Sequence, residues 1–321
     1  ITGQVWYDKT NKVLQFQAEG AASWASGGNL GTARRQMAGA GVSSSSALGF
    51  GGYLAPGASS APSALTESYD GTSWTEVGDL NTARRGLMGN GTQTSALAYG
   101  GNAPGAANGH SAKTDSWNGS AWTEAADLNT ARQQGGGAGA SNTSALASGG
   151  GGFPSLGVVA VVEHWNGTSW TETADLNQAR YGVQGFGTKS SAIVCGGQSP
   201  PGNYYELTES WNDTAWTEVA DISFERSFGG SAGSDNTSGL IFGGYDDSPT
   251  DLRTDKVELW NGTAWSEQAD LSSPPGFLGI AGAGTATSAI AFGGEGPSNE
   301  MRAATEEWSN PTLTIKTVST D

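Results

Sequence analysis

The chain of 321 residues contains 51 glycines, 12 tryptophans and one cysteine, and its formal net charge is −16. Tryptophans at this density need a folded interior that buries them. The acidic balance argues against nucleic acid and anionic membrane surfaces as partners, because both need clusters of Lys and Arg. No stretch of the sequence has the length and apolarity of a membrane-spanning helix. The single Cys195 excludes an internal disulfide framework and a Cys-based zinc site.

The first predicted element is a hairpin in residues 1–21, where the apolar runs 5–7 and 13–16 flank a polar turn. The last is a strand within the C-terminal tail, residues 311–321. We expect these two segments to attach the protein to an assembly. Between them, residues 22–310 carry an internal repeat.

Six copies of a unit of about 48 residues make up this repeat. Each is marked by a Gly pair, then an aromatic residue, then a Trp five positions later. In the second copy, an apolar strand ends at Gly100–Gly101, and the turn Asn118–Gly119 separates strands around Trp117 and Trp122. An Asn-Gly dipeptide predicts a type I′ hairpin turn. The Trp of the last strand recurs as Trp24, Trp74, Trp122, Trp170, Trp216 and Trp265.

Four antiparallel strands per copy predict an all-β fold, a six-bladed β-propeller with four-stranded blades. The strand around Trp24 precedes every complete copy, and the final copy ends after its third strand at Trp308. We therefore expect the Trp24 strand to complete the last blade, which removes the open edges of the ring. The alternative is seven blades, with the two terminal segments forming most of the seventh.

The Gly pair, aromatic residue and Trp resemble the kelch repeat family over residues 23–309, although Trp usually replaces the family's Tyr on the third strand. The repeated sequence Trp-Asn-Gly-Thr-Ser-Trp-Thr-Glu, followed by Asp-Leu-Asn-Thr-Ala-Arg, is also similar to sequences in repeat proteins of marine bacteriophage genomes. The first resemblance implies kelch-like blades. The second implies a virion- or tail-associated protein, on a virion or outside a cell, and leaves a cytoplasmic location open.

Charged residues recur as well: an Arg follows five of the fourth strands, and an acid lies on every third strand. A residue repeated in every blade points to structure, since a functional site is needed once. We expect ion pairs or capping bonds that tie blades together; the alternative is an arginine ring for an anionic ligand. The arginines are Arg34, Arg84, Arg132, Arg180 and Arg226, and the acids are Glu67, Asp115, Glu163, Glu209, Glu258 and Glu306.

The loops between second and third strands are long and differ from copy to copy, so their face of the propeller is the predicted binding face. Tyr and Asp side chains suit sugar or protein recognition. Asp246 and Asp247 with Asp251 also offer oxygen ligands for Ca²⁺, the alternative being a solvated acidic loop. The candidate binding residues are Tyr53, His110, Tyr204, Tyr205, Tyr245, Asp246 and Asp247.

No catalytic constellation stands out: His110 and His164 belong to different copies, and the other polar residues follow the repeat. The favoured function is a non-enzymatic binding or structural module without a cofactor. Its partners are other proteins of an assembly or a surface glycan. The alternative is a carbohydrate-active enzyme, because propellers resembling this one include glycosidases and oxidases.

Overall fold

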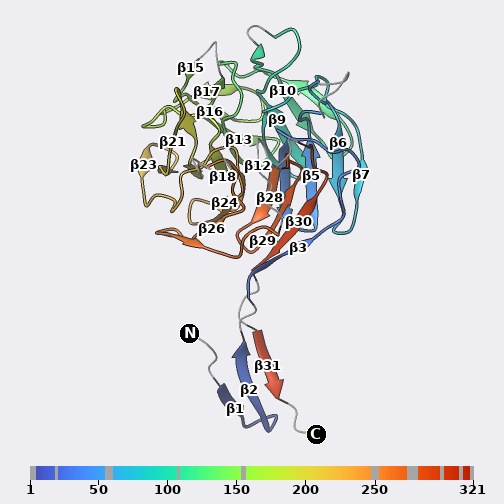
Figure 1. Ribbon diagram of the computed structural model, residues 1–321, viewed down its shortest axis with the longest axis vertical. Coiled ribbons are helices and arrows are strands. Elements are labelled where there is room, and N and C mark those ends of the chain that lie inside the picture. The colour runs from blue at the N-terminus through green and yellow to red at the C-terminus, as the bar shows by residue number, and fades with distance from the viewer. Residues whose placement is uncertain are drawn as a thin grey trace.

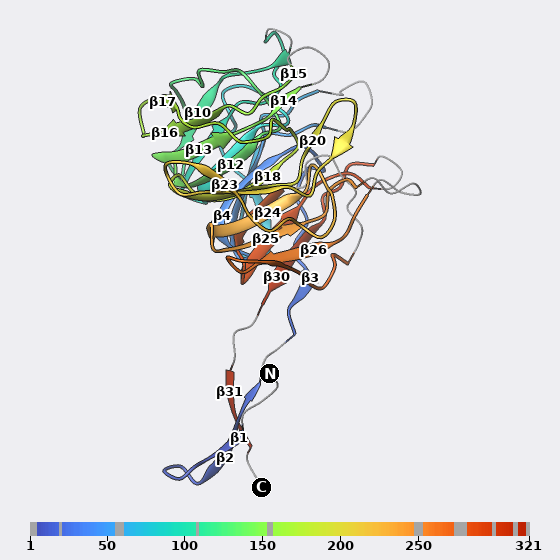
Figure 2. The ribbon, with the colours of Figure 1, turned by 90° about the vertical axis from the view of Figure 1, so that its left-hand side faces the viewer.

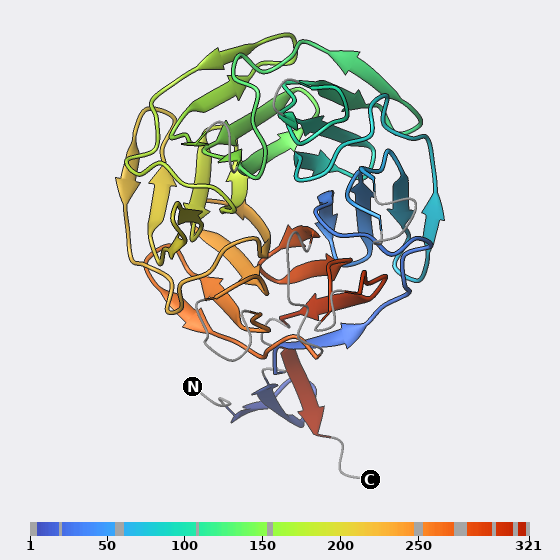
Figure 3. The same ribbon diagram turned by 45° about the horizontal axis from the view of Figure 1, so that its top comes forward.

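The computed structural model describes residues 5–18, 21–54, 61–106, 109–152, 157–246, 253–272, 281–296, 300–310 and 314–318. Every regular element assigned in these ranges is a β-strand. Six four-stranded sheets surround a central channel, and a three-stranded sheet stands away from the ring (Figures 1 and 3). The six-bladed β-propeller predicted from the repeat is confirmed.

In blades I to V the four strands follow the chain from the channel outward, and all neighbours are antiparallel. Blade I consists of β4 (Ala38–Ser43), β5 (Ser46–Phe50), β6 (Thr66–Tyr69) and β7 (Trp74–Glu76). Blade II consists of β8 (Met88–Thr92), β9 (Ser95–Tyr99), β10 (Thr114–Trp117) and β11 (Trp122–Ala125). Blade III consists of β12 (Gly136–Ser141), β13 (Ser144–Ser148), β16 (Val162–Trp165) and β17 (Trp170–Glu172).

The next two blades repeat the arrangement, and short hairpins extend the loops of blades III and IV. Blade IV consists of β18 (Gln184–Thr188), β19 (Ser191–Cys195), β22 (Thr208–Trp211) and β23 (Trp216–Glu218). Blade V consists of β24 (Gly230–Asp235), β25 (Ser238–Phe242), β26 (Val257–Trp260) and β27 (Trp265–Glu267). The hairpins are β14 (Gly151–Gly152) with β15 (Gly157–Val158), and β20 (Gln198–Ser199) with β21 (Asn203–Tyr204).

Blade VI joins the two ends of the ring. Its strands are β28 (Ala281–Thr285), β29 (Ser288–Phe292), β30 (Thr305–Ser309) and β3 (Ser23–Ser26). Trp24 stands directly opposite Trp308, with ring centroids 5.3 Å apart. The expected closure by the Trp24 strand is therefore confirmed, and the outer edge of β30 is covered by a strand about 280 residues away in the chain.

The terminal segments form a sheet of their own, here called the terminal sheet. It consists of β1 (Val5–Asp8), β2 (Val13–Ala18) and β31 (Thr314–Val318), with β2 in the middle. Figures 1 and 2 show this sheet outside the ring, beyond blade VI. The seven-bladed alternative is therefore wrong, because these strands pair with one another and not with a propeller strand.

The glycines of the inner strands let neighbouring blades approach closely. A Cβ on Gly39 would lie 2.5 Å from the carbonyl oxygen of Gly282, and one on Gly282 would lie 2.6 Å from that of Ser231. Ser231 stands in blade V where most blades have Gly, and its hydroxyl donates to Gly185 O at 2.8 Å. Backbone packing around a narrow channel therefore explains much of the glycine content.

Aromatic pairs fill the outer part of each blade. The third-strand aromatic and the fourth-strand Trp are directly opposed in register, with ring centroids 5.0–5.4 Å apart. The outer Trp also contacts the preceding blade: Trp122 Nε1 donates to Thr66 Oγ1 at 3.0 Å, and Trp170 Nε1 donates to Thr114 Oγ1 at 3.0 Å. The recurring Trp therefore packs within one blade and hydrogen-bonds to another.

The turn between the third and fourth strands differs from the prediction. Trp117 pairs with Trp122, so the loop has four residues, and of these Gly119 alone has a positive φ, of 96°. Asn118 Oδ1 accepts the backbone N–H groups of Ser120 and Ala121 at 2.9 and 3.0 Å. The predicted type I′ turn is therefore wrong, because an Asx turn satisfies the loop backbone over a longer connection. Asp70, Asn166, Asn212 and Asn261 make the same contacts.

One glycine makes room for a large neighbour. Phe186 of β18 occupies a position that is Ala in most blades, and a Cβ on Gly239 of β25 would lie 2.1 Å from Phe186 Cε2. We expect Gly239→Ala to lower the free energy of unfolding by about 1–3 kcal/mol through overpacking, measured by urea denaturation. In a Phe186→Ala background the same substitution should cost much less. Equal losses in both backgrounds would contradict this explanation.

Candidate functional site

The repeated arginines form buried clamps. Arg34 Nη2 donates to Glu67 Oε1 at 2.7 Å, and its Nη1 donates to the carbonyl oxygens of Gly51 and Leu65 at 2.8 and 2.7 Å. Neither charged side chain is more than 4% exposed in any of the five pairs. The other pairs are Arg84–Asp115, Arg132–Glu163 at 2.6 Å, Arg180–Glu209 at 2.5 Å and Arg226–Glu258 at 2.7 Å.

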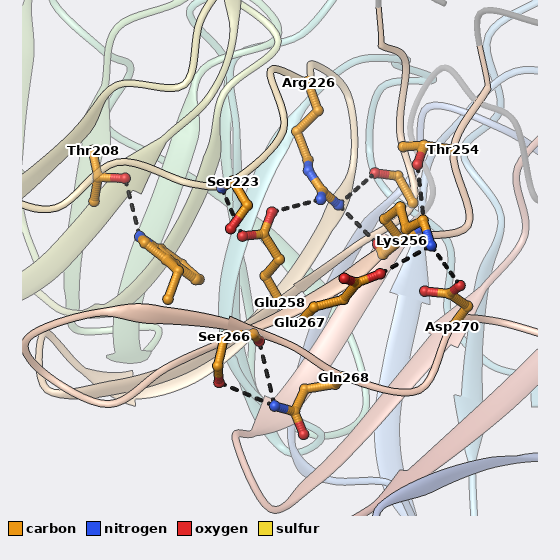
Figure 4. Close-up of polar contacts among 12 residues, drawn as sticks. Thr208, Ser223, Arg226, Thr254, Lys256, Glu258, Ser266, Glu267, Gln268 and Asp270 are labelled. Carbon is orange, nitrogen blue, oxygen red and sulfur yellow. Dashed lines mark hydrogen bonds and ion pairs between the residues drawn. The ribbon is translucent and has the colours of Figure 1, made fainter.

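Each clamp arginine joins two blades. The carbonyl oxygen of Arg34 accepts the N–H of Gly294 in blade VI at 2.8 Å, while its side chain binds Glu67 in blade I. Figure 4 shows the Arg226–Glu258 clamp together with the half-buried Lys256, which contacts Glu267 and Asp270. Because the clamp guanidinium groups are buried and bonded, they offer no accessible ring of arginines to a ligand.

Blade VI departs from the clamp pattern. Its preceding linker contains Pro274, Pro275 and Phe277 and has no Arg. Glu306 of β30 nevertheless makes one contact that the clamp carboxylates also make: it accepts a backbone N–H of the preceding linker, that of Ser272, at 2.9 Å. The sequence that joins blades V and VI therefore lacks the arginine that clamps the other five joints.

The linkers between blades and the loops after the Gly pairs meet on one face, here called the loop face. The residue after a clamp arginine forms a β-bridge with the residue after the Gly pair of the same blade, as in Arg35↔Tyr53 and Ser227↔Tyr245. Unlike the clamps, these bridge positions do not repeat. They are Arg35, Arg85, Gln133, Tyr181 and Ser227 on the linkers, and Tyr53, Asn102, Gly151, Gln198, Tyr245 and Glu295 after the Gly pairs.

A polar cluster crosses blades VI, I and II on this face. The Tyr53 ring lies between two guanidinium groups, with its centroid 5.3 Å from Arg35 Cζ and 4.6 Å from Arg85 Cζ. Arg35 also forms an ion pair with Glu295, which is buried. Burial lowers the pKa of Arg35, and the neighbouring Arg85 lowers it further. Cation–π contacts therefore hold two like charges close together.

An aromatic cluster lies on the same face in blades IV and V. The Phe228 ring is edge-on to Tyr181, with centroids 5.8 Å apart, and edge-on to Tyr245 at 6.5 Å. All three residues are half-buried. Burial raises the pKa of Tyr181, so its hydroxyl stays protonated near neutral pH. The cluster thus presents apolar rings beside the protonated hydroxyl of Tyr181.

Five linker residues surround the channel opening, and we call them the mouth ring. They are Gln36, Gly86, Gln134, Gly182 and Phe228. They are joined by backbone hydrogen bonds: Gly86 N to Gln36 O, Gln134 N to Gly86 O, Gly182 N to Gln134 O, and Phe228 N to Gly182 O, at 2.7–2.9 Å. All five have left-handed φ values of 55–66°. A non-Gly residue in this conformation costs about 1–2 kcal/mol. The ring lines a cavity of about 90 Å³ above the channel.

The candidate binding residues fall in several places. Tyr53 and Tyr245 occupy equivalent bridge positions on the loop face. Tyr204 pairs with Gln198 in the β20–β21 hairpin, and the Tyr205 hydroxyl lies 2.7 Å from Ser199 Oγ. The predicted tyrosines therefore belong to three different blades, I, IV and V.

The predicted histidine is buried at a bridge position. His110 pairs with Asn102, is 4% exposed, and its Nδ1 has no hydrogen-bond partner in the part of the chain that the structure describes. Burial lowers its pKa, which favours the neutral imidazole. His164 lies on β16 in blade III, so the two histidines are not brought together.

Asp246 is half-buried next to Tyr245, whereas Asp247 and Asp251 lie outside the described residues. Across the described ranges, no three His, Cys, Asp or Glu side chains are grouped as metal ligands. The Ca²⁺ expectation therefore stays a prediction.

The most distinctive residues of the loop face escaped the sequence analysis. Arg35, Arg85, Gln36, Gln134 and Phe228 stand one or two places after a clamp arginine. An alignment of the repeats on the clamp arginine would have identified them. The clamp arginine is the same in five copies, whereas the next two positions vary.

No protein-family model matches the chain, and no curated protein matches its sequence. Solved structures do match: the chain is similar to the structure of YjhT, with a TM-score of 0.68 over 90% of this chain and 99% of that one. At 12% identity this likeness shows the propeller fold alone. The described residues include no helix with the length and apolarity to span a membrane.

Proposed function

We propose that this protein is a non-enzymatic binding module that recognises a glycan or a protein through its loop face. The observation that carries the proposal is the division of the molecule into two sets of residues. The buried clamps and the inner, third-strand aromatic residues repeat, whereas the residues around the channel mouth differ from blade to blade. Variable residues on a rigid scaffold are the usual arrangement of a recognition surface.

A glycan suits the chemistry of this face better than other ligands. The Phe228, Tyr181 and Tyr245 rings offer apolar surfaces to the C–H faces of sugars. The Gln36 and Gln134 amides carry both donors and acceptors for hydroxyl groups. Arg85 supplies a cation for any acidic substituent.

The proposal extends to a kelch-like protein of a virion or tail that works outside the cell. The resemblance of the repeated sequence to phage repeat proteins supports this proposal. The terminal sheet supports it too, because the strand register places Val5, Tyr7 and Leu14 on one face of that sheet. These side chains are 61%, 55% and 44% exposed, which is unusual for apolar residues of a sheet. Sheets normally bury one face, so an assembly partner is the expected cover.

A glycan array read for both binding and hydrolysis tests the proposal. We expect binding without turnover, and a loss of at least about tenfold in affinity for Tyr53→Ala, since Tyr53 holds Arg35 and Arg85 in place. The matched control is Lys189→Gln, in the β18–β19 turn at the opposite end of the strands from the loop face. Turnover of a bound glycan would favour the carbohydrate-active enzyme, and equal loss in both variants would contradict recognition by the loop face.

A further inference from the structure

The mouth ring concentrates backbone strain that a glycine would avoid. Five non-Gly residues among those described have a left-handed φ, and three of them, Gln36, Gln134 and Phe228, occupy the same repeat position. Blades II and IV have Gly86 and Gly182 there, with the same φ and the same hydrogen-bonded backbone. Glycine therefore meets every backbone requirement of this position. The three side chains must be kept for another reason.

These side chains alternate with glycine around the channel mouth. An ideal Cβ on Gly86 would lie 3.2 Å from Gln134 Cγ, and one on Gly182 would lie 2.9 Å from Phe228 Cε1. Gln134 and Phe228 therefore extend across the neighbouring glycine and form walls of the mouth cavity. Glycine at every second position leaves room for them.

Filling space does not account for the chemistry of these walls. Gln134 and Phe228 are only half-buried. The side-chain amides of Gln36 and Gln134 form no hydrogen bond with any residue that the structure describes. Neither amide is among the buried polar atoms that lack a hydrogen-bond partner, so both amides are open to solvent. The amides are thus available to a ligand.

We propose that Gln36, Gln134 and Phe228 form a subsite for one neutral sugar ring at the channel mouth, an inference that rests on the proposed glycan-binding function. The two amides donate to and accept from hydroxyl groups. The Phe228 ring, supported by Tyr181 and Tyr245, packs on the C–H face of the sugar. The hydrogen-bonded mouth ring holds the three side chains in place before the ligand arrives.

The test uses the double variant Gln36→Gly with Gln134→Gly, and Asp213→Gly as its matched control. Asp213 also has a left-handed φ, of 75°, in a turn where four other blades have Gly, far from the loop face. Relief of strain should raise the Tm of both variants by about 2–4 °C. Saturation-transfer NMR with glucose, galactose, mannose and N-acetylglucosamine should show at least one sugar contacting the wild type and Asp213→Gly, with the signal lost in the double variant.

Three results would overturn the subsite. The first is a lower Tm of the double variant, which would make the two Gln side chains structural. The second is sugar contact that survives in the double variant. The third is array binding by the wild type with none of the four sugars in contact, which refutes this subsite and leaves the proposed function intact. Absence of both array binding and sugar contact would instead refute the glycan-binding function itself.

Discussion

Replacing Glu163 with Gln is expected to lower the free energy of unfolding by about 3–5 kcal/mol, because it leaves Arg132 as a buried charge without its counter-ion. Both side chains are at most 1% exposed. Glu163 Oε1 accepts from Arg132 Nη1 at 2.6 Å, and Oε2 accepts the backbone N–H of Asn129 at 2.8 Å. The substitution therefore weakens a contact between blades II and III as well as removing a charge.

Urea denaturation followed by tryptophan fluorescence measures this loss. Lys113→Gln provides the control, because it breaks an ion pair with Glu124 in which both side chains are well exposed, and it should leave the unfolding midpoint unchanged. Arg132→Met combined with Glu163→Leu should be more stable than Glu163→Gln alone, since no unpaired charge remains. If Glu163→Gln unfolds like the wild type, the clamps do not hold the blades together.

Deleting residues 1–26 is expected to destabilise the propeller even more, because it removes β3 from blade VI. The deletion exposes the backbone edge of β30 and takes away Trp24, whose ring packs 5.3 Å from Trp308 and 5.2 Å from Phe242 of blade V. An open edge also invites pairing with another chain. We expect a lower Tm by differential scanning calorimetry, together with aggregation during concentration.

Deleting residues 1–20 is the matched control. It removes β1 and β2 of the terminal sheet but keeps β3. This shorter deletion should leave the Tm of the propeller close to that of the full chain, since neither strand pairs with a blade. Similar losses in the two deletions would mean that the terminal sheet, and not β3, holds the ring together.

The blade count and the closure of the ring could be predicted from sequence because both follow from counting. Six Gly pairs and six third strands, with a Trp24 strand left at the N-terminus, permit few arrangements without an open edge. The seven-bladed alternative could not be dismissed in that way. Residues 13–16 and 312–318 alternate like blade strands, and whether they pair with each other or with a propeller strand depends on distances that the sequence does not state.

The turn after the third strand was predicted wrongly for a local reason. Asn118–Gly119 is the strongest signal for a two-residue turn, but the tryptophans on both sides pair directly and lengthen the loop to four residues. Packing of the aromatic pair therefore overrides the preference of the dipeptide. Asn118 then stabilises the longer loop through its side-chain oxygen, which accepts two backbone N–H groups.

By itself, the sequence determined the kind of fold, the number of blades and which residues recur, because each blade repeats the same short-range chemistry. It also pointed to the loop face as variable. Only the tertiary structure decided which variable residues meet. Tyr53 lies between Arg35 and Arg85, and Gln36, Gln134 and Phe228 surround one channel mouth, because the curvature of the ring brings together residues about fifty positions or more apart in the chain. The repeat is thus explained by packing within and between blades, and the candidate site by how the blades close into a circle.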